Sequence, residues 1–211
     1  MLRRIVWVPL IFAVAAGAAG KQHGAFKPVV AQQRITYIAR DMSGGEKVLS
    51  IYEGQYLRMA DGSELATLGP PNQKATEARL RLASDGTTYK LDFKKKTATL
   101  VATEKLPLLP KAGKTGKAHE KIEGRVCDVQ TVKSFGVETG TSYREPKHDL
   151  LVRLVSYFGS KDDQVKVVME RYNINTKTEP DASFFAIPGG WTVIAPRVAD
   201  TPKGEIEKAA K

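Results

Sequence analysis

Apolar and polar residues alternate one by one through most of this chain, and this period of two constrains the fold more than any other feature. Ile35, Tyr37 and Ala39 alternate with polar neighbours, and the same pattern recurs in residues 79–82 and 89–93. Successive side chains of a β-strand point to opposite faces of its sheet, so such segments have one buried face and one solvated face. The pattern therefore predicts an antiparallel sheet and a mainly β protein with few helices.

Turn signals divide the alternating segments into about nine or ten expected strands. The expected strands are residues 33–40, 48–52, 56–59, 79–82, 89–93, 97–103, 122–132, 150–158, 165–174 and 191–194. Asp85-Gly86 predicts a hairpin of type I′, and Glu53-Gly54 predicts another turn. Residues 150–158 are apolar on both faces, which predicts cover on both sides. Residues 66–75 are expected to be irregular, with a short helix near 74–77.

The first twenty residues have the organisation of a secretory signal peptide. Arg3 and Arg4 precede an apolar run over residues 5–16, which ends in small residues. A run of this length is shorter than the roughly 20 residues that span a bilayer, although an uncleaved anchor is the alternative. We therefore expect a signal peptide over residues 1–20, one domain over 21–196 and a polar tail over 197–211. The expected location is periplasmic or secreted.

The chain is basic, with 33 Lys and Arg against 23 Asp and Glu. Removal of residues 1–20, which contain two arginines, leaves 31 basic and 23 acidic residues and a net charge of +8. This charge favours anionic partners, including peripheral contact with an anionic membrane surface, and export argues against nucleic acid. A dispersed, solubilising charge is the alternative. Cys127 is the only cysteine, so it forms no intramolecular disulfide, and a buried thiol is favoured over a reactive one.

No catalytic, metal-binding or cofactor-binding motif is present. His23, His119 and His148 lie far from one another and lack the spacing of zinc motifs. Gly113-Lys114-Thr115 lacks the first glycine that a P-loop requires. We therefore expect no cofactor, no metal and no enzymatic activity. A hydrolase assembled from distant strands is retained as the least favoured alternative.

Three stretches resemble exported proteins with the LolA/LolB-like fold of the outer-membrane lipoprotein-sorting carriers. They are residues 179–194, which contain Pro188-Gly189-Gly190-Trp191, together with residues 54–59 and 120–127. The resemblance implies a strongly curved antiparallel sheet, a half-barrel, that lies over a few short helices.

The resemblance also implies a non-enzymatic envelope protein that binds a lipid, an acyl chain or a lipidated peptide on the concave face of the half-barrel. Burial of an acyl chain there would supply the binding energy. The residues expected to line this face are Tyr37, Leu57, Met59, Tyr89, Leu91, Phe93, Leu154, Phe158 and Phe184. Ordinary core packing is the alternative for each of them. The alternative function is a structural or sensory module with a plugged barrel that binds an envelope protein.

Overall fold

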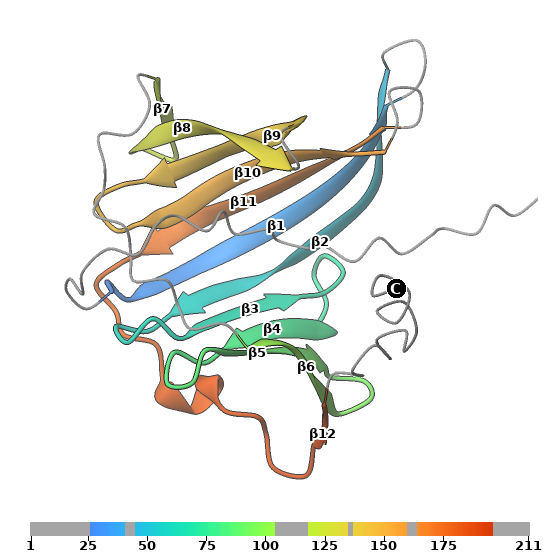
Figure 1. Ribbon diagram of the computed structural model, residues 1–211, viewed down its shortest axis with the longest axis vertical. Helices are drawn as coiled ribbons and strands as arrows, with labels where there is room; N and C mark the ends of the chain where they lie inside the picture. The colour runs from blue at the N-terminus through green and yellow to red at the C-terminus, as the bar shows by residue number, and fades with distance from the viewer. Residues whose placement is uncertain (1–25, 41–44, 104–117, 135–136, 160–163, 196–211) are drawn as a thin grey trace, which may run out of the picture.

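A single twelve-stranded sheet accounts for nearly all of the regular structure (Figure 1). The computed structural model describes residues 26–40, 45–103, 118–134, 137–159 and 164–195. The expected signal peptide and polar tail lie outside these residues. The strands are β1 (Val29–Arg40), β2 (Glu46–Arg58), β3 (Glu64–Leu68), β4 (Glu77–Arg81), β5 (Thr87–Asp92), β6 (Thr97–Thr103), β7 (His119–Ile122), β8 (Arg125–Ser134), β9 (Val137–Glu145), β10 (Leu150–Phe158), β11 (Val165–Asn175) and β12 (Thr192–Ile194). A 3-10 helix, η1 (Ala182–Phe185), precedes β12.

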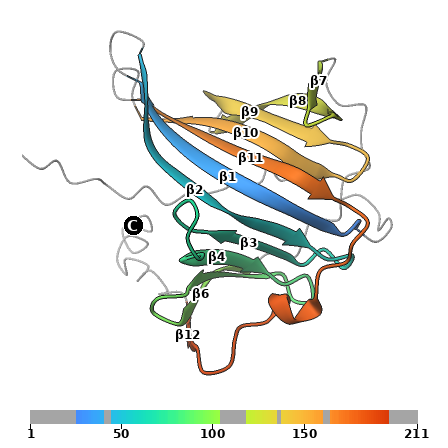
Figure 2. The same ribbon diagram turned by 180° about the vertical axis from the view of Figure 1, so that it is seen from behind.

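The strand order is β12-β6-β5-β4-β3-β2-β1-β11-β10-β9-β8-β7. It consists of two antiparallel meanders, β1 to β6 and β7 to β11, that join where β1 pairs with β11. Figure 2 shows the two meanders from behind, with η1 and β12 beside the β4–β6 end. β12 is parallel to β6, the one exception to antiparallel pairing in the described sheet. Among the described residues no helix is long and apolar enough to cross a membrane.

The mainly β, curved antiparallel architecture confirms the expectation from alternation, but several local predictions were wrong. Gly54 is not a turn, because β2 continues straight through it. A Cβ at Gly54 would lie 1.9 Å from the backbone oxygen of Thr67, so only glycine fits where β2 and β3 approach each other. Residues 74–77 form no helix, and the Thr76 amide instead donates to the Leu68 carbonyl.

The hairpin at Asp85-Gly86 is present, but its geometry differs from the prediction. Gly86 has a φ of 73°, whereas Asp85 is not among the residues with positive φ, so the turn is not type I′. The Asp85 carboxylate instead accepts hydrogen bonds from the backbone and the hydroxyl of Thr87. The Asp85 side chain, by accepting hydrogen bonds from the residue two positions later in the chain, thus stabilises a wider turn.

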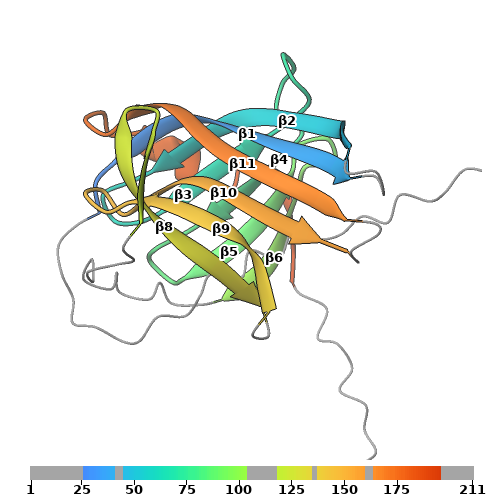
Figure 3. The same cartoon turned by 90° about the horizontal axis from the view of Figure 1, so that it is seen from above.

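The sheet is an open arch. Figure 3, seen from above, shows β1, β2 and β11 across the top of the view, with β8, β9 and β6 below them. Arg171 of β11 contacts Tyr56 of β2 although β1 lies between their strands. Contacts across an intervening strand require the sheet to bend toward that side. We therefore call the side that carries Tyr56, Arg171 and Ile35 the concave face.

The buried residues form clusters on both faces. One cluster joins Leu57, Leu65, Leu80 and Leu91 to Phe185 of η1. The register places these leucines opposite to Tyr56 in the pleat, so this cluster lies on the convex face of β2–β6. The other two clusters lie on the concave face. One surrounds Val29, Tyr56, Cys127 and Leu150, and the other surrounds Ile35, Val167 and Met169.

Candidate functional site

The concave face is apolar on its β1, β10 and β11 side. Buried Ile35, Val167 and Met169 form the base of this apolar wall. Half-buried hydrophobic side chains pack against that base. They are Tyr37, Leu151, Leu154, Phe158 and Val165, and Leu68 at the end of β3 packs against the same base. Among the described residues the only helix lies on the convex side, so no helix covers this wall.

The same concave face is polar on its β3, β4 and β5 side. Directly paired residues of neighbouring strands share a face, so the register can be followed from strand to strand. One row across this polar wall contains Glu64, Arg81 and Thr88, and the next contains Ala66, Arg79 and Lys90. The concave face is therefore amphipathic across its width, with its hydrophobic and charged sides on different strands.

A partly buried ionic network lies where the two walls meet. The Tyr56 hydroxyl donates a 2.7 Å hydrogen bond to Oε1 of Glu64. The Arg171 guanidinium carbon lies 3.4 Å from the centre of the Tyr56 ring, and Nη1 donates to the Leu151 carbonyl. Burial, with the nearby Glu64 carboxylate as a second cause, raises the pKa of Tyr56 above its ordinary value. Burial lowers the pKa of Arg171, and its Nε has no hydrogen-bond partner among the described residues.

Arg58 ties three segments together at one end of the concave face. It is 2% exposed, and its guanidinium donates to the backbone carbonyls of Lys27, His148 and Asp149. A cation that is surrounded by carbonyl oxygens holds the start of β1 against the loop between β9 and β10. Arg58 is thus a structural clamp at this end of the face.

A second polar cluster lies beside that clamp. Arg125 donates to both carboxylate oxygens of Glu145, at 3.1 and 3.0 Å, and also to the Ile174 carbonyl. Nδ1 of His148 lies 2.8 Å from the same carboxylate. Cys127 is buried close by, as the sequence predicted, and burial followed by the Glu145 charge raises the pKa of its thiol. Nothing in this cluster pairs the thiol with an activating base.

The nine residues expected to line the concave face divide between the two faces. Tyr37, Leu154 and Phe158 belong to the apolar wall. Five others lie in or against the convex cluster. They are Leu57, Met59, Tyr89, Leu91 and Phe93, the last stacked edge-to-face on Trp191 at 5.4 Å. Phe184 lies on η1 and is 55% exposed. Alternation identified residues that share a face within a strand, but it did not identify the face toward which the sheet bends.

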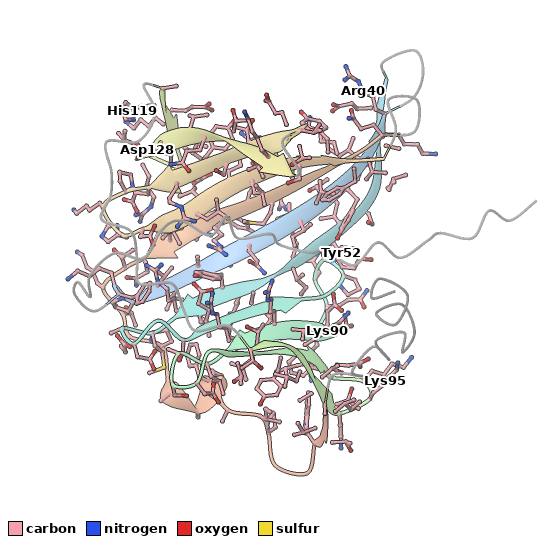
Figure 4. The ribbon with its side chains drawn as sticks, in the orientation of Figure 1. Arg40, Tyr52, Lys90, Lys95, His119 and Asp128 are labelled. Atoms are coloured by element: carbon pink, nitrogen blue, oxygen red, sulfur yellow. The ribbon has the colours of Figure 1, made fainter. Side chains whose placement is uncertain are left out.

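The sequence analysis did not predict the charged part of the concave face. It also did not predict two contacts between a histidine and a carboxylate, His119 with Asp128 and His148 with Glu145. Arg79, Arg81 and Lys90 are polar residues of the alternating segments. Only the register shows that Arg79 and Lys90 share one row and that Arg81 lies in the next row on the same face. His119 lies 2.9 Å from Asp128 at the β7–β8 edge of the sheet (Figure 4). No group of three or more His, Cys, Asp or Glu residues in the described part of the chain could hold a metal ion.

A shallow pocket of about 230 Å³ lies around the outer side of β1, β2 and β11. Gln32, Gln55 and Tyr172 share this convex side by register. The complete lining is Gln32, Glu53, Gly54, Gln55, Pro70, Asn72, Gln73 and Tyr172. This lining is mostly polar, which does not suit an acyl chain.

No protein-family model matches the chain, and no curated protein matches it. Among solved structures, it is similar to an uncharacterised conserved protein from Thermus thermophilus at 7% identity and a TM-score of 0.46, covering 78% of this chain and 90% of that one. It is also similar to the MucA/MucB complex structure of Pseudomonas aeruginosa, at 12% identity and a TM-score of 0.37, covering 74% and 55%. A LolA superfamily protein from Nitrosomonas europaea matches at 11% identity and a TM-score of 0.27, covering 74% and 90%.

Proposed function

We propose that this chain is an exported, non-enzymatic envelope protein that binds an acyl lipid on the apolar wall of its concave face. The observation that carries the proposal is that wall itself: half-buried Tyr37, Leu154 and Phe158 lie over a buried base without a covering helix among the described residues. Half-buried apolar side chains on a concave face suit the apolar part of a ligand.

The energetics support an apolar occupant. Each methylene that a ligand buries against the wall contributes about 0.8 kcal/mol, so a chain that buries ten of them gains about 8 kcal/mol before binding costs. Tyr37 adds an aromatic ring to the wall. This ring packs edge-to-face on Tyr52, with centroids 5.9 Å apart. Burial raises the pKa of Tyr37, so its hydroxyl stays neutral at physiological pH. The apolar wall thus carries no charge that an acyl chain would have to desolvate.

The test is titration of the purified chain with a fluorescent fatty-acid probe. We expect micromolar binding, and we expect the double variant Leu154→Ala/Phe158→Ala to weaken it at least tenfold, since each truncation removes roughly 1–2 kcal/mol of apolar contact. Phe184→Ala is the matched control, because it removes an aromatic ring from η1 on the convex side. Circular dichroism verifies that the variants keep their β structure. Absence of probe binding to the unsubstituted chain would refute the proposal.

A second candidate function, protein binding, is favoured by one specific observation. β3 pairs only with residues 56–58 of β2, and an isolated bridge joins Glu53 to Gly69. In the described structure residues 46–52 of β2 therefore have no neighbour on that side. Val48, Leu49 and Ile51 in this stretch are 52, 55 and 37% exposed. An unpaired, apolar strand edge can take an extended peptide by strand addition. Protection of these amides from hydrogen exchange by an envelope protein, without uptake of the lipid probe, would favour this candidate.

A further inference from the structure

The shallow pocket on the convex side of β1, β2 and β11 lies on the face of the sheet opposite to the apolar wall. One row of the sheet forms part of its lining, because Gln32 pairs with Tyr172 on one side and with Gln55 on the other. The three strands that carry this row are neighbours near the middle of the sheet (Figure 1). Side chains on paired strands keep fixed relative positions, so the row presents two amides and a phenol ring on a rigid support.

The rim of the pocket is a short loop that is anchored to β2. Glu53 and Gly69 exchange two backbone hydrogen bonds, each of 2.9 Å, which hold the start of the loop against the strand. The Gln73 amide then donates to the Pro70 carbonyl, and Asn72 between them has a φ of 59°, a conformation that asparagine tolerates. The side chains of this loop thus complete a lining that the strands begin.

The charges at the pocket are balanced. Glu53 is the one charged residue of the lining, and its Oε1 lies 2.9 Å from Nε and 2.8 Å from Nη2 of Arg34. The Arg34 guanidinium also lies over the Tyr172 ring, 5.5 Å from its centre. Because the carboxylate and the guanidinium are paired with each other, neither is left to attract a free ion strongly. This balance favours a neutral ligand over an ionic one.

The other polar side chains of the lining are amides, which both donate and accept hydrogen bonds. Oε1 of Gln32 accepts a 2.7 Å hydrogen bond from Nδ2 of Asn173, so the NH2 group of Gln32 remains a donor for a ligand. The side chains of Gln55, Asn72 and Gln73 are exposed and therefore accessible. A sugar hydroxyl likewise both donates and accepts, so an array of amides matches a ring of hydroxyls.

We propose that this pocket binds a neutral saccharide through one sugar ring. The electron-rich face of the Tyr172 ring attracts the polarised C–H groups of a sugar, while the amides and the Glu53 carboxylate bind its hydroxyls. The volume of about 230 Å³ is below the roughly 300–1,000 Å³ of pockets for drug-sized ligands, so a single ring fits better than a larger ligand. This site is independent of the acyl-lipid function, because the two surfaces lie on opposite faces of the sheet.

The test is an NMR titration of the isotopically labelled full chain with glucose, galactose, mannose and N-acetylglucosamine. We expect at least one of these sugars to bind with a dissociation constant of about 1–10 mM, since a shallow pocket leaves much of the ring in water. The backbone amide signals of Gln32, Gln55 and Tyr172 should shift. The uronic acid of the sugar that binds best should bind about threefold more weakly, because Glu53 repels its carboxylate.

Two variants test the assignment of the residues. Tyr172→Ala and Gln55→Ala should each weaken binding about fivefold, the first by loss of the aromatic ring and the second by loss of an amide. The Gln55 side chain is exposed, so its truncation leaves the fold intact. Tyr157→Ala is the matched control, because it removes a 37% exposed tyrosine from the same convex face outside the pocket.

The outcomes separate the explanations. Shifts at the pocket that Tyr172→Ala and Gln55→Ala reduce and Tyr157→Ala preserves support the proposal. No shift with any of the four sugars, or shifts that all three variants preserve, overturn it. Tighter binding of the uronic acid than of its parent sugar overturns the assignment of a neutral ligand.

Discussion

Removal of one hydroxyl tests the network at the junction of the two walls. Tyr56→Phe keeps the ring that lies under Arg171 and deletes the 2.7 Å hydrogen bond to Glu64. A hydrogen bond to a charged partner contributes about 1.5–3 kcal/mol, and Glu64 is only half-buried, so its carboxylate regains some water. We therefore expect the free energy of unfolding to fall by about 1.5–2 kcal/mol. For a chain of this size the melting temperature should fall by roughly 3–8 °C.

Tyr56→Leu extends the same experiment, because it also removes the ring from the Arg171 guanidinium. A desolvated cation–π contact contributes about 2 kcal/mol, so this variant should lose about 2 kcal/mol more than Tyr56→Phe. Urea denaturation followed by circular dichroism measures both losses. Tyr157→Phe is the control, because Tyr157 is 37% exposed and should change stability by less than about 0.5 kcal/mol. A loss below about 0.5 kcal/mol for Tyr56→Phe would refute the reasoning.

Three further predictions follow from the same contacts. The contribution of Tyr56 to stability should be present up to about pH 10 and be lost above it, because burial raises the pKa of its hydroxyl and ionisation then favours the unfolded chain; above pH 10 the urea midpoint of Tyr56→Phe should fall less than that of the unsubstituted chain. Gly54→Ala should lower the urea midpoint clearly, because the new Cβ would lie 1.9 Å from a backbone oxygen, whereas Gly189→Ala, with open space around its Cβ, should change it little. Cys127 should react with iodoacetamide at pH 8 only after unfolding, since the thiol is buried and its pKa is raised; rapid labelling of the native chain would contradict this placement.

Period-two alternation predicted the sheet because a strand with one buried face leaves that pattern directly in the sequence. Leu80 and Leu91 illustrate this, since both are buried and both lie in expected strands. The strands β3, β7 and β9 were not recognised as separate elements. β9 contains the sequence VETGTSYRE, which has few hydrophobic residues, and it forms because both of its neighbours supply backbone partners. Tertiary context of this kind leaves no local signal.

The prediction of the candidate site was limited for a different reason. Alternation assigns Leu57 and Tyr56 to opposite faces, but the direction of bending depends on bulges and contacts between distant strands. The segment after Pro180 shows the same limit. Asp181 caps η1, with its carboxylate accepting from the Ser183 amide, and Phe185 is 8% exposed. Phe184, its neighbour, was expected to line the concave face and is exposed on η1 instead, because a single 3-10 turn presents only one of the two rings to the sheet.

Photo-crosslinking with a diazirine-labelled fatty acid tests the central claim most directly, because mass spectrometry of the digested chain then identifies the residues that contact the ligand. The account predicts crosslinks on concave residues of β1, β10 and β11, with Tyr37, Leu154 and Phe158 among them, and their loss when unlabelled palmitate competes. Competed crosslinks confined to η1 and the convex side of β2–β6 would contradict the account.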